Sequence, residues 1–260
     1  MISIWPRQCR RFFLLAGMMM LAGGFWQVEA KDPDALWKIV DGQCVRHQNE
    51  TGSPGPCVLL DLSAGAGIAV LKDRDGIAQF LLIPTKKLTG VESPELLASD
   101  APNYWAYAWQ AKRFVEESLQ RPLARDQVAL AINSAYGRSQ RQLHIHVDCI
   151  RSDVRESLLR SVGHIGEQWA PLEEPLSGHP YWARRIRGEE LGGSNPFKLL
   201  ADGISLAGQH MDRQTLVLTG ATFEDGSEGF LLLDDQADAA TADRASGEEL
   251  LDHACTLAGR

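Results

Sequence analysis

Two histidines stand two residues apart in a stretch that alternates strictly between apolar and polar side chains. The apolar set is Leu143, Ile145, Val147 and Cys149, and the polar set is Gln142, His144, His146 and Asp148. A period of two predicts a β-strand, which places both imidazoles on one face, about 7 Å apart at roughly 3.3 Å rise per residue. Because an imidazole titrates near neutral pH, one ring can serve as a nucleophile and the other as a proton or hydrogen-bond donor.

A His-x-His pair on a strand also fits two other interpretations, a metal site or no site at all. A metal site needs a third ligand and further residues that orient the ligands. The candidates for that ligand are Asp148, His164 and His179, but their positions in the sequence do not show that they lie near the histidine pair. The upstream Gly137-Arg138-Ser139 favours a phosphate instead, since glycine frees the backbone, arginine offers a charged fork and serine a hydroxyl.

The overall composition is that of a globular protein with an acidic balance. The chain has 260 residues, of which 44% are hydrophobic and 23% charged, and a formal net charge of −8. Nucleic-acid binding needs a broad basic face, so this charge argues against a nucleic-acid partner while leaving room for a local basic pocket.

The N-terminal segment has the pattern of a targeting sequence. Arg7, Arg10 and Arg11 precede an uncharged, mostly apolar run of 17 residues at 12–28. That length is at the lower edge for crossing a bilayer and also suits a signal peptide. We expect residues 1–30 to be an anchor or signal segment, with the uncleaved anchor favoured. Residues 31–260 are then expected to form one domain outside the cytoplasmic membrane.

Four cysteines follow this segment, at positions 44, 57, 149 and 255. An even number in an exported domain predicts two disulfides, and the sequence leaves three pairings open. The pair Cys44–Cys57 is the easiest to form because it closes a short loop rich in glycine, proline and polar residues. Cys149 would then pair with Cys255 and hold the C-terminal segment against the back of the histidine strand.

The rest of the chain predicts an antiparallel α+β domain. Strands are expected at 68–71, 78–83, 128–132, 142–149, 215–219 and 229–233. Helices are expected at 31–46, 103–120, 153–165 and 243–257, with loops at 47–57 and 171–180. Since the first half runs strand, strand, helix, strand, strand with short turns, neighbouring strands are expected to pair antiparallel.

The histidine strand and its lead-in resemble the histidine-triad motif, in which three histidines alternate with apolar residues. The strand ending in Ile83-Pro84 also resembles an anchor of that family. Aligning the lead-in puts Gln142 where the family has its first histidine, His144 at the middle position and His146 at the third. The resemblance implies that His144 is the nucleophile, with Gln142 as a neutral partner that cannot titrate, and Lys87 stands where the family often has histidine.

Over its whole length the chain resembles the bacterial CDP-diacylglycerol pyrophosphatase family within this group. The matching segments are 131–134, 149–155, 178–185 and 194–197, and the four cysteines also agree in position. The resemblance implies a histidine-triad-like antiparallel sheet with helices, elaborated by a C-terminal α/β half. It also implies hydrolysis of CDP-diacylglycerol to CMP and phosphatidate with no cofactor or metal, by a single-pass inner-membrane protein whose catalytic domain is periplasmic.

The implied mechanism has His144 attacking the α-phosphorus and His146 donating to a phosphate oxygen. Candidate substrate or phosphate ligands are Gln142, Ser139, Asn133, Arg138, Lys72 and His179. Three alternatives stay open: transfer of the cytidylyl group to an acceptor other than water, a non-catalytic nucleotide- or phospholipid-binding protein, and a metallohydrolase using His144, His146 and Asp148. The sequence does not determine the oligomeric state.

Overall fold

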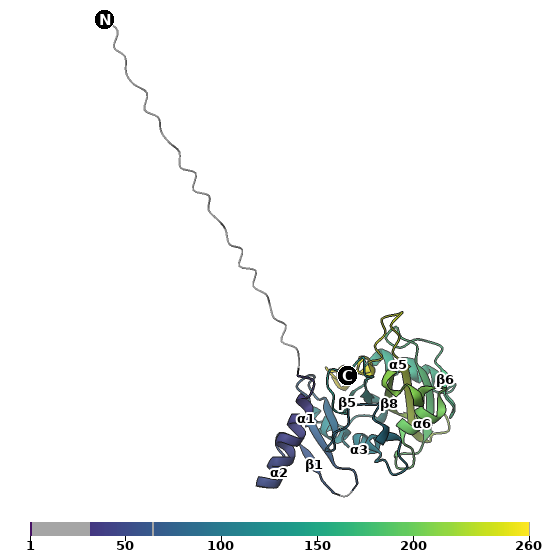
Figure 1. The fold of residues 1–260 in the computed structure, drawn as a ribbon. Helices are drawn as coiled ribbons and strands as arrows, with labels where there is room; N and C mark the ends of the chain where they lie inside the picture. The colour runs from purple at the N-terminus through teal and green to yellow at the C-terminus, as the bar shows by residue number, and fades with distance from the viewer. Residues whose placement is uncertain (2–31, 64, 260) are drawn as a thin grey trace. The chain divides into compact units, whose positions relative to one another are not determined.

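A single antiparallel sheet of nine strands runs through the part of the chain that the computed structural model describes, namely Met1 and residues 32–63 and 65–259 (Figure 1). The strands are β1 (Leu59–Asp61), β2 (Ile68–Lys72), β3 (Phe80–Pro84), β4 (Val128–Ile132), β5 (Ile145–Cys149), β6 (Ala170–Pro171), β7 (Trp182–Arg187), β8 (Gln214–Thr222) and β9 (Glu228–Gln236). Their order in the sheet is β1-β2-β3-β5-β4-β8-β9-β7-β6, so β5 lies between β3 and β4.

Helices cover both faces of this sheet. The α-helices are α1 (Ala35–Ile39), α2 (Arg46–Thr51), α3 (Tyr104–Gln110), α4 (Lys112–Leu119), α5 (Ser152–Ser161) and α6 (Pro196–Gly203). A π-helical turn, η1 (Val40–Val45), joins α1 to α2. The 3-10 turns are η2 (Pro94–Leu97), η3 (Arg125–Gln127), η4 (Ala207–Gln209), η5 (Met211–Arg213), η6 (Gly247–Leu250) and η7 (Thr256–Gly259).

The alternation of side chains along each strand divides the core between the two faces. On one face, strand residues such as Leu82, Leu130 and Val147 pack against the helices that carry Trp105 and Phe197. The rings of Trp105 and Phe197 meet edge to face with their centroids 5.6 Å apart. The opposite face carries two separate apolar clusters, one beneath α1 and one beneath α5.

The antiparallel α+β prediction is confirmed, and most predicted elements lie within a few residues of their observed bounds. The predicted helix at 103–120 is interrupted at Ala111, which separates α3 from α4. The expected loop at 47–57 was wrong in its first part, because helix α2 continues to Thr51. The C-terminal half does not form a separate α/β layer; β6 to β9 extend the same antiparallel sheet.

The predicted terminal helix at 243–257 was also wrong. The segment instead contains the short turns η6 and η7, and its backbone pairs with the chain just after β5. Leu251 forms an antiparallel bridge with Ile150, and the Asp252 N–H donates to the Cys149 carbonyl at 2.8 Å. These bonds use backbone groups that a helix would need internally, so tertiary pairing replaces the helix.

The disulfides join Cys44 to Cys57 and Cys149 to Cys255, which confirms the favoured pairing. The predicted anchor at residues 1–30 lies, apart from Met1, outside the described residues. Among the residues that are described, none of the helices has the length and apolar character needed to cross a membrane.

The longer disulfide loop gives the first testable prediction. Replacing Cys149 and Cys255 together by serine should lower the free energy of unfolding by about 4.7 kcal/mol, against about 3 kcal/mol for the Cys44/Cys57 double variant. The difference follows from the sequence separations of 106 and 13 residues, because the longer crosslink restricts the unfolded chain more. Urea unfolding of both variants measures it, and an equal or reversed ranking would contradict the loop argument.

Candidate active site

The histidine pair lies at the start of β5 on one face of the sheet. His144 directly precedes the strand and His146 is its second residue; both are buried, with 8% and 4% of their surface exposed. Their ring centroids are 4.9 Å apart and the rings meet edge to face. The prediction that the two imidazoles share one face is confirmed.

The pairing register places His146 between the two apolar clusters of this face. Across the sheet His146 lies opposite Leu81 on β3 and Ala131 on β4. Leu81 belongs to the cluster beneath α1, and Ala131 to the cluster beneath α5. The imidazoles therefore occupy a polar position flanked by apolar walls, where electrostatic interactions are stronger than in water.

A backbone hydrogen bond determines the tautomer of His144. Its Nδ1 lies 2.7 Å from the carbonyl oxygen of Gln142, which can only accept, so Nδ1 carries the proton and Nε2 the lone pair. Burial, and then the neighbouring His146, lower the pKa of His144 to about 4. At neutral pH the ring is therefore uncharged, with a free nitrogen suited to nucleophilic attack.

His146 has the opposite arrangement of its ring nitrogens. The amide nitrogen of the buried Gln79 lies 2.8 Å from His146 Nδ1 and 2.9 Å from an Asp73 carboxylate oxygen. Because the Asp73 carboxylate requires a donor, the amide N–H groups of Gln79 point to both partners, so His146 Nδ1 accepts and Nε2 bears the proton. His146 Nε2 makes no hydrogen bond in the structure and lies 3.5 Å from a Glu248 oxygen. Burial lowers the pKa of His146, which leaves a neutral donor beside the nucleophile.

Glu248 on η6 reaches the histidines from the C-terminal part of the chain. Asn133 holds it twice, donating to its carboxylate at 3.1 Å and accepting from its backbone N–H at 3.1 Å. Burial acts to raise the pKa of Glu248, but His146 and the hydrogen bonds of Asn133 and Gln79 lower it on balance. Glu248 is therefore an ionised carboxylate beside the donor nitrogen of His146.

A second acid–imidazole pair continues this network. His253 Nδ1 lies 2.8 Å from Asp148 Oδ2, and His253 Nε2 lies 3.6 Å from the other Glu248 oxygen. The Asp148 hydrogen bond raises the pKa of His253. The four side chains thus run in the order Asp148, His253, Glu248, His146, and the His253 ring separates the two carboxylates.

Three of the predicted phosphate ligands already bind groups of the protein. Gln142 donates from its amide nitrogen to the carbonyls of Pro84 and Lys86, both at 3.0 Å. Arg138 forms a two-pronged ion pair with Glu92. Lys72 donates to backbone carbonyls of the turn after β2. These donors hold the loops around the strand, and a phosphate would have to compete with those partners.

The other three predicted ligands lie in different surroundings. Asn133 joins the histidine pair through Glu248, whereas Ser139 is exposed. His179 binds Glu249 at 2.9 Å, in an acidic cluster separate from the histidine pair. Phosphate contacts by the six residues stay predictions.

The side chains around the pair do not favour the metallohydrolase alternative. The Asp148 carboxylate accepts from the Cys149 backbone N–H and bonds to His253, and the adjacent cysteines form a disulfide. Within the described ranges, the histidine pair does not gather with a third ligand into a cluster that could hold an ion.

Sequence reasoning missed Gln79, Glu248 and His253. The last two come from a segment about a hundred residues beyond the strand, and no motif links them to it. Gln79 carried a weak signal, since it is the one polar side chain in the apolar run 78–84, which otherwise reads Ala-Phe-Leu-Leu-Ile-Pro.

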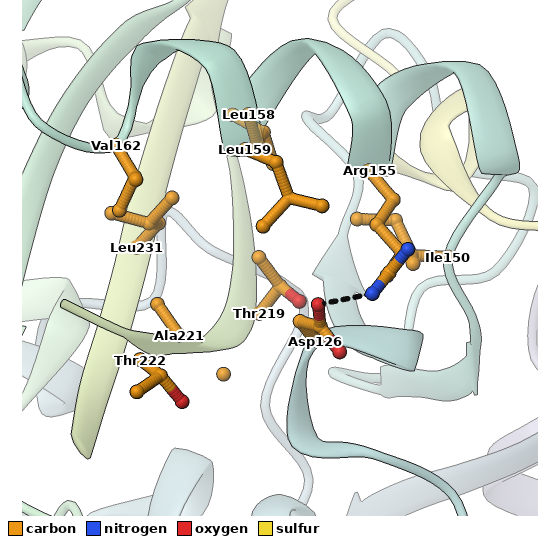
Figure 2. A pocket seen from close by; sticks show the side chains of 11 residues that line it. Asp126, Ile150, Arg155, Leu158, Leu159, Val162, Thr219, Ala221, Thr222 and Leu231 are labelled. Atoms are coloured by element: carbon orange, nitrogen blue, oxygen red, sulfur yellow. Dashed lines mark hydrogen bonds and ion pairs between the residues drawn. The ribbon is translucent and has the colours of Figure 1, made fainter. Parts of the chain in front are cut away.

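An apolar pocket on the same side of the sheet is not part of this site. Figure 2 shows that leucine side chains of α5, and Val162 directly after it, face residues of β8 and β9 across the pocket. Arg155 and Asp126, which also line it, form an ion pair at 2.6 Å. Its lining contains none of the histidines, so the pocket lacks the side chains that could react with a substrate.

The sequence of the chain matches a known protein family. Residues 31–259 match the family described as CDP-diacylglycerol pyrophosphatase. A protein from Yersinia pestis named CDP-diacylglycerol pyrophosphatase is 44% identical over 253 residues, which cover 97% of this chain and 95% of that protein. The family match spans both the histidine strand and the η6 segment that supplies Glu248.

A titration followed by NMR of ¹⁵N-labelled histidine checks the charge state of the pair. His144 should stay neutral down to about pH 4, because burial and then His146 lower its pKa. His253 should protonate above the ordinary histidine range, because Asp148 raises its pKa. A His144→Gln variant assigns the signal, and titration of His144 at the ordinary value of about 6.5 would contradict a buried neutral nucleophile.

The lowered pKa of His144 also has a definite effect on stability. Between about pH 6.5 and 4 the unfolded chain binds a proton at His144 that the folded chain does not, so the free energy of unfolding falls as the pH is lowered. The His144→Gln variant lacks this effect and should lose stability less steeply in urea unfolding across that window. A His164→Gln variant, altered at an exposed histidine, is the control and should follow the native slope. Parallel profiles for native and His144→Gln would refute the effect.

Proposed function

The chain belongs to the CDP-diacylglycerol pyrophosphatase family and hydrolyses CDP-diacylglycerol, and we propose that it does so through a cytidylyl group carried covalently on His144. The observation that carries this proposal is the tautomer of His144, whose Nδ1 proton is held by the Gln142 carbonyl. The lone pair of Nε2 is then available for attack without prior loss of a proton.

In the first step His144 Nε2 attacks the α-phosphorus of the cytidylyl group. The bond from that phosphorus to the bridging oxygen breaks, and phosphatidate leaves with the electron pair. The imidazole becomes positively charged in the adduct, and the Nδ1–H to carbonyl bond strengthens as that charge develops. Hydrogen bonding by Gln142 to the chain after β3 keeps this carbonyl in place.

His146 donates a hydrogen bond to an oxygen of the departing phosphatidate. Its Nε2–H has no hydrogen-bond partner within the described structure, so it can bind a phosphate oxygen without giving up a protein hydrogen bond. His146 keeps this proton throughout, because its loss from a neutral ring would leave an imidazolate, and phosphatidate leaves as a phosphate anion. In the second step water adds to the phosphorus of the adduct and its proton passes to solvent. The bond to His144 Nε2 breaks with the electron pair returning to the ring, and CMP leaves.

Glu248 is a positioning residue in this scheme. Its carboxylate lies beside His146 Nε2 and favours the protonated state of that nitrogen through its charge. Because Asn133 fixes both the carboxylate and the backbone of Glu248, the direction of the His146 donor is set by η6.

Transfer of the cytidylyl group to another acceptor uses the same adduct, so hydrolysis and transfer differ only in product.

The lipid substrate also favours a membrane tether by the apolar run at 12–28, since tethering raises the encounter rate at the bilayer surface. That tether, with the catalytic domain on the periplasmic side of the inner membrane, is part of the proposal.

The adduct is tested with CDP-diacylglycerol that carries a radiolabelled α-phosphate. The native chain should release labelled CMP in water and pass through a protein adduct that acid cleaves and alkali preserves. His144→Ala should lose turnover at least about a thousand-fold and acquire no label. His164→Ala, altered at an exposed histidine, should behave as the native chain. Near-native turnover by His144→Ala would refute the nucleophile, and absence of CMP would favour a transferase or a binding protein.

The role of Glu248 predicts a particular kinetic pattern. Glu248→Gln should lower kcat by about a hundred-fold while KM and the thermal midpoint stay close to native, because the lost charge acts on the hydrogen bond that His146 donates in the transition state. Glu248→Asp should restore part of kcat. Glu117→Gln, on the exposed side of α4, is the matched control and should keep native kinetics. A rise in KM or a loss of stability in place of the kcat effect would show a structural role instead.

A further inference from the structure

A second cluster of ionisable side chains lies on the same face of the sheet, at the end of β9. It consists of His179, Asp235 and Glu249, which each offer one ligand atom within 4.8 Å of those of the others. Asp243 lies beside them, with a carboxylate oxygen 3.8 Å from His179 Nδ1. The members come from distant parts of the chain, so the fold brings them together.

The turn η6 separates this cluster from the catalytic histidines. Gly247 fastens η6 to β8 through a 2.9 Å hydrogen bond from its N–H to the Thr215 hydroxyl. From this turn Glu248 reaches His146, whereas the next residue, Glu249, reaches His179. Whatever holds Glu249 in place therefore also holds the backbone that presents Glu248.

A second observation, independent of the clustering, indicates that Asp235 binds a ligand. Only 3% of its surface is exposed, and its Oδ1 accepts from the Gln236 backbone N–H at 2.8 Å. Its other oxygen, Oδ2, is buried without a hydrogen-bond partner. A buried carboxylate oxygen without a donor is unfavourable by several kcal/mol in general, so such oxygens are found paired or bound to a cation.

The negative charge of the cluster is compensated only in part. In the described part of the chain no lysine or arginine forms an ion pair with Asp235, Asp243 or Glu249, and His179 is the one basic side chain among them. The site therefore needs either a proton or a cation.

Contacts within the protein fix the positions of His179 and Glu249 and still leave atoms of these side chains free to bind a metal. His179 ends a tight turn in which Ser177 and Gly178 have φ of 51° and 90°, closed by hydrogen bonds between Leu176 and His179 in both directions. The hydroxyl of the buried Tyr181 donates to a Glu249 oxygen at 2.9 Å. A fixed backbone and an outer hydrogen bond of this kind orient metal ligands in proteins.

We propose that His179, Asp235 and Glu249 bind one divalent transition-metal cation such as Zn²⁺ or Mn²⁺, with Asp243 as a further carboxylate beside it. One imidazole nitrogen with two or three carboxylate oxygens suits these ions, whereas Mg²⁺ and Ca²⁺ prefer oxygen ligands alone. On binding, the proton that His179 Nδ1 shares with Glu249 passes to solvent, the Nδ1 lone pair binds the metal, and Nε2 carries the remaining ring proton. The cation links the chain at 179, 235 and 249, and its role is structural.

The test uses the full-length chain without a polyhistidine tag, stripped of metal by a chelator and then dialysed. Calorimetric titration with ZnCl₂ and with MnCl₂ measures the stoichiometry, and thermal unfolding measures the stabilisation. We expect one cation per chain and a higher midpoint with metal for at least one of the two ions. Asp235→Asn and His179→Gln should each weaken binding at least tenfold and abolish the rise in midpoint.

The variants keep the proposal falsifiable. Asp235→Asn removes a buried charge at constant shape, so it should fold without metal at least as stably as the native chain. His210→Ala, altered at an exposed histidine outside the cluster, should bind the cation as the native chain does. Absence of stoichiometric binding by both ions, or binding that survives both cluster substitutions, would overturn the site and leave a protonated acid cluster. The result is independent of the cytidylyl adduct, because hydrolysis is not the readout.

Discussion

Burial of two neutral imidazoles on one face of a sheet is the constraint on which the rest of this site depends. In an apolar setting neither ring can carry a charge without a compensating group. One nitrogen of each ring therefore needs a fixed hydrogen-bond partner, and the other stays unbonded. The Gln142 carbonyl accepts a hydrogen bond from His144 Nδ1–H, and the Gln79 amide donates one to the lone pair of His146 Nδ1. The remaining nitrogen of each ring is thereby left for chemistry, one as a nucleophile and one as a donor.

Gln142 shows how the strand works with two histidines where the histidine-triad motif has three. Its backbone carbonyl fixes the tautomer of His144, and its side chain binds the carbonyls of Pro84 and Lys86 at the end of β3. An amide suits this position because it offers two donors at any pH. The residue that departs from the motif thus connects the nucleophile to the neighbouring strand.

The turn η6 connects the chemistry to the stability of the C-terminal segment. It is fastened to β8 through Gly247 and to Asn133 at the end of β4, while the Cys149–Cys255 disulfide closes the segment beyond it. Glu248 and Glu249 leave this turn toward two different polar clusters. A short turn with few backbone hydrogen bonds of its own can hold such positions only because its surroundings fix it.

The sequence by itself determined the antiparallel α+β class and the shared face of His144 and His146, and it favoured one of three disulfide pairings because Cys44 and Cys57 lie close together in the chain. Those features follow from local periodicity and short spacing, which a single segment carries. Tertiary structure alone decided that Gln79 and Glu248 meet His146, and that 243–257 pairs with β5 and does not form a helix. Contacts between segments more than a hundred residues apart leave no periodic trace, because they are selected by packing and by the demand of buried polar groups for partners.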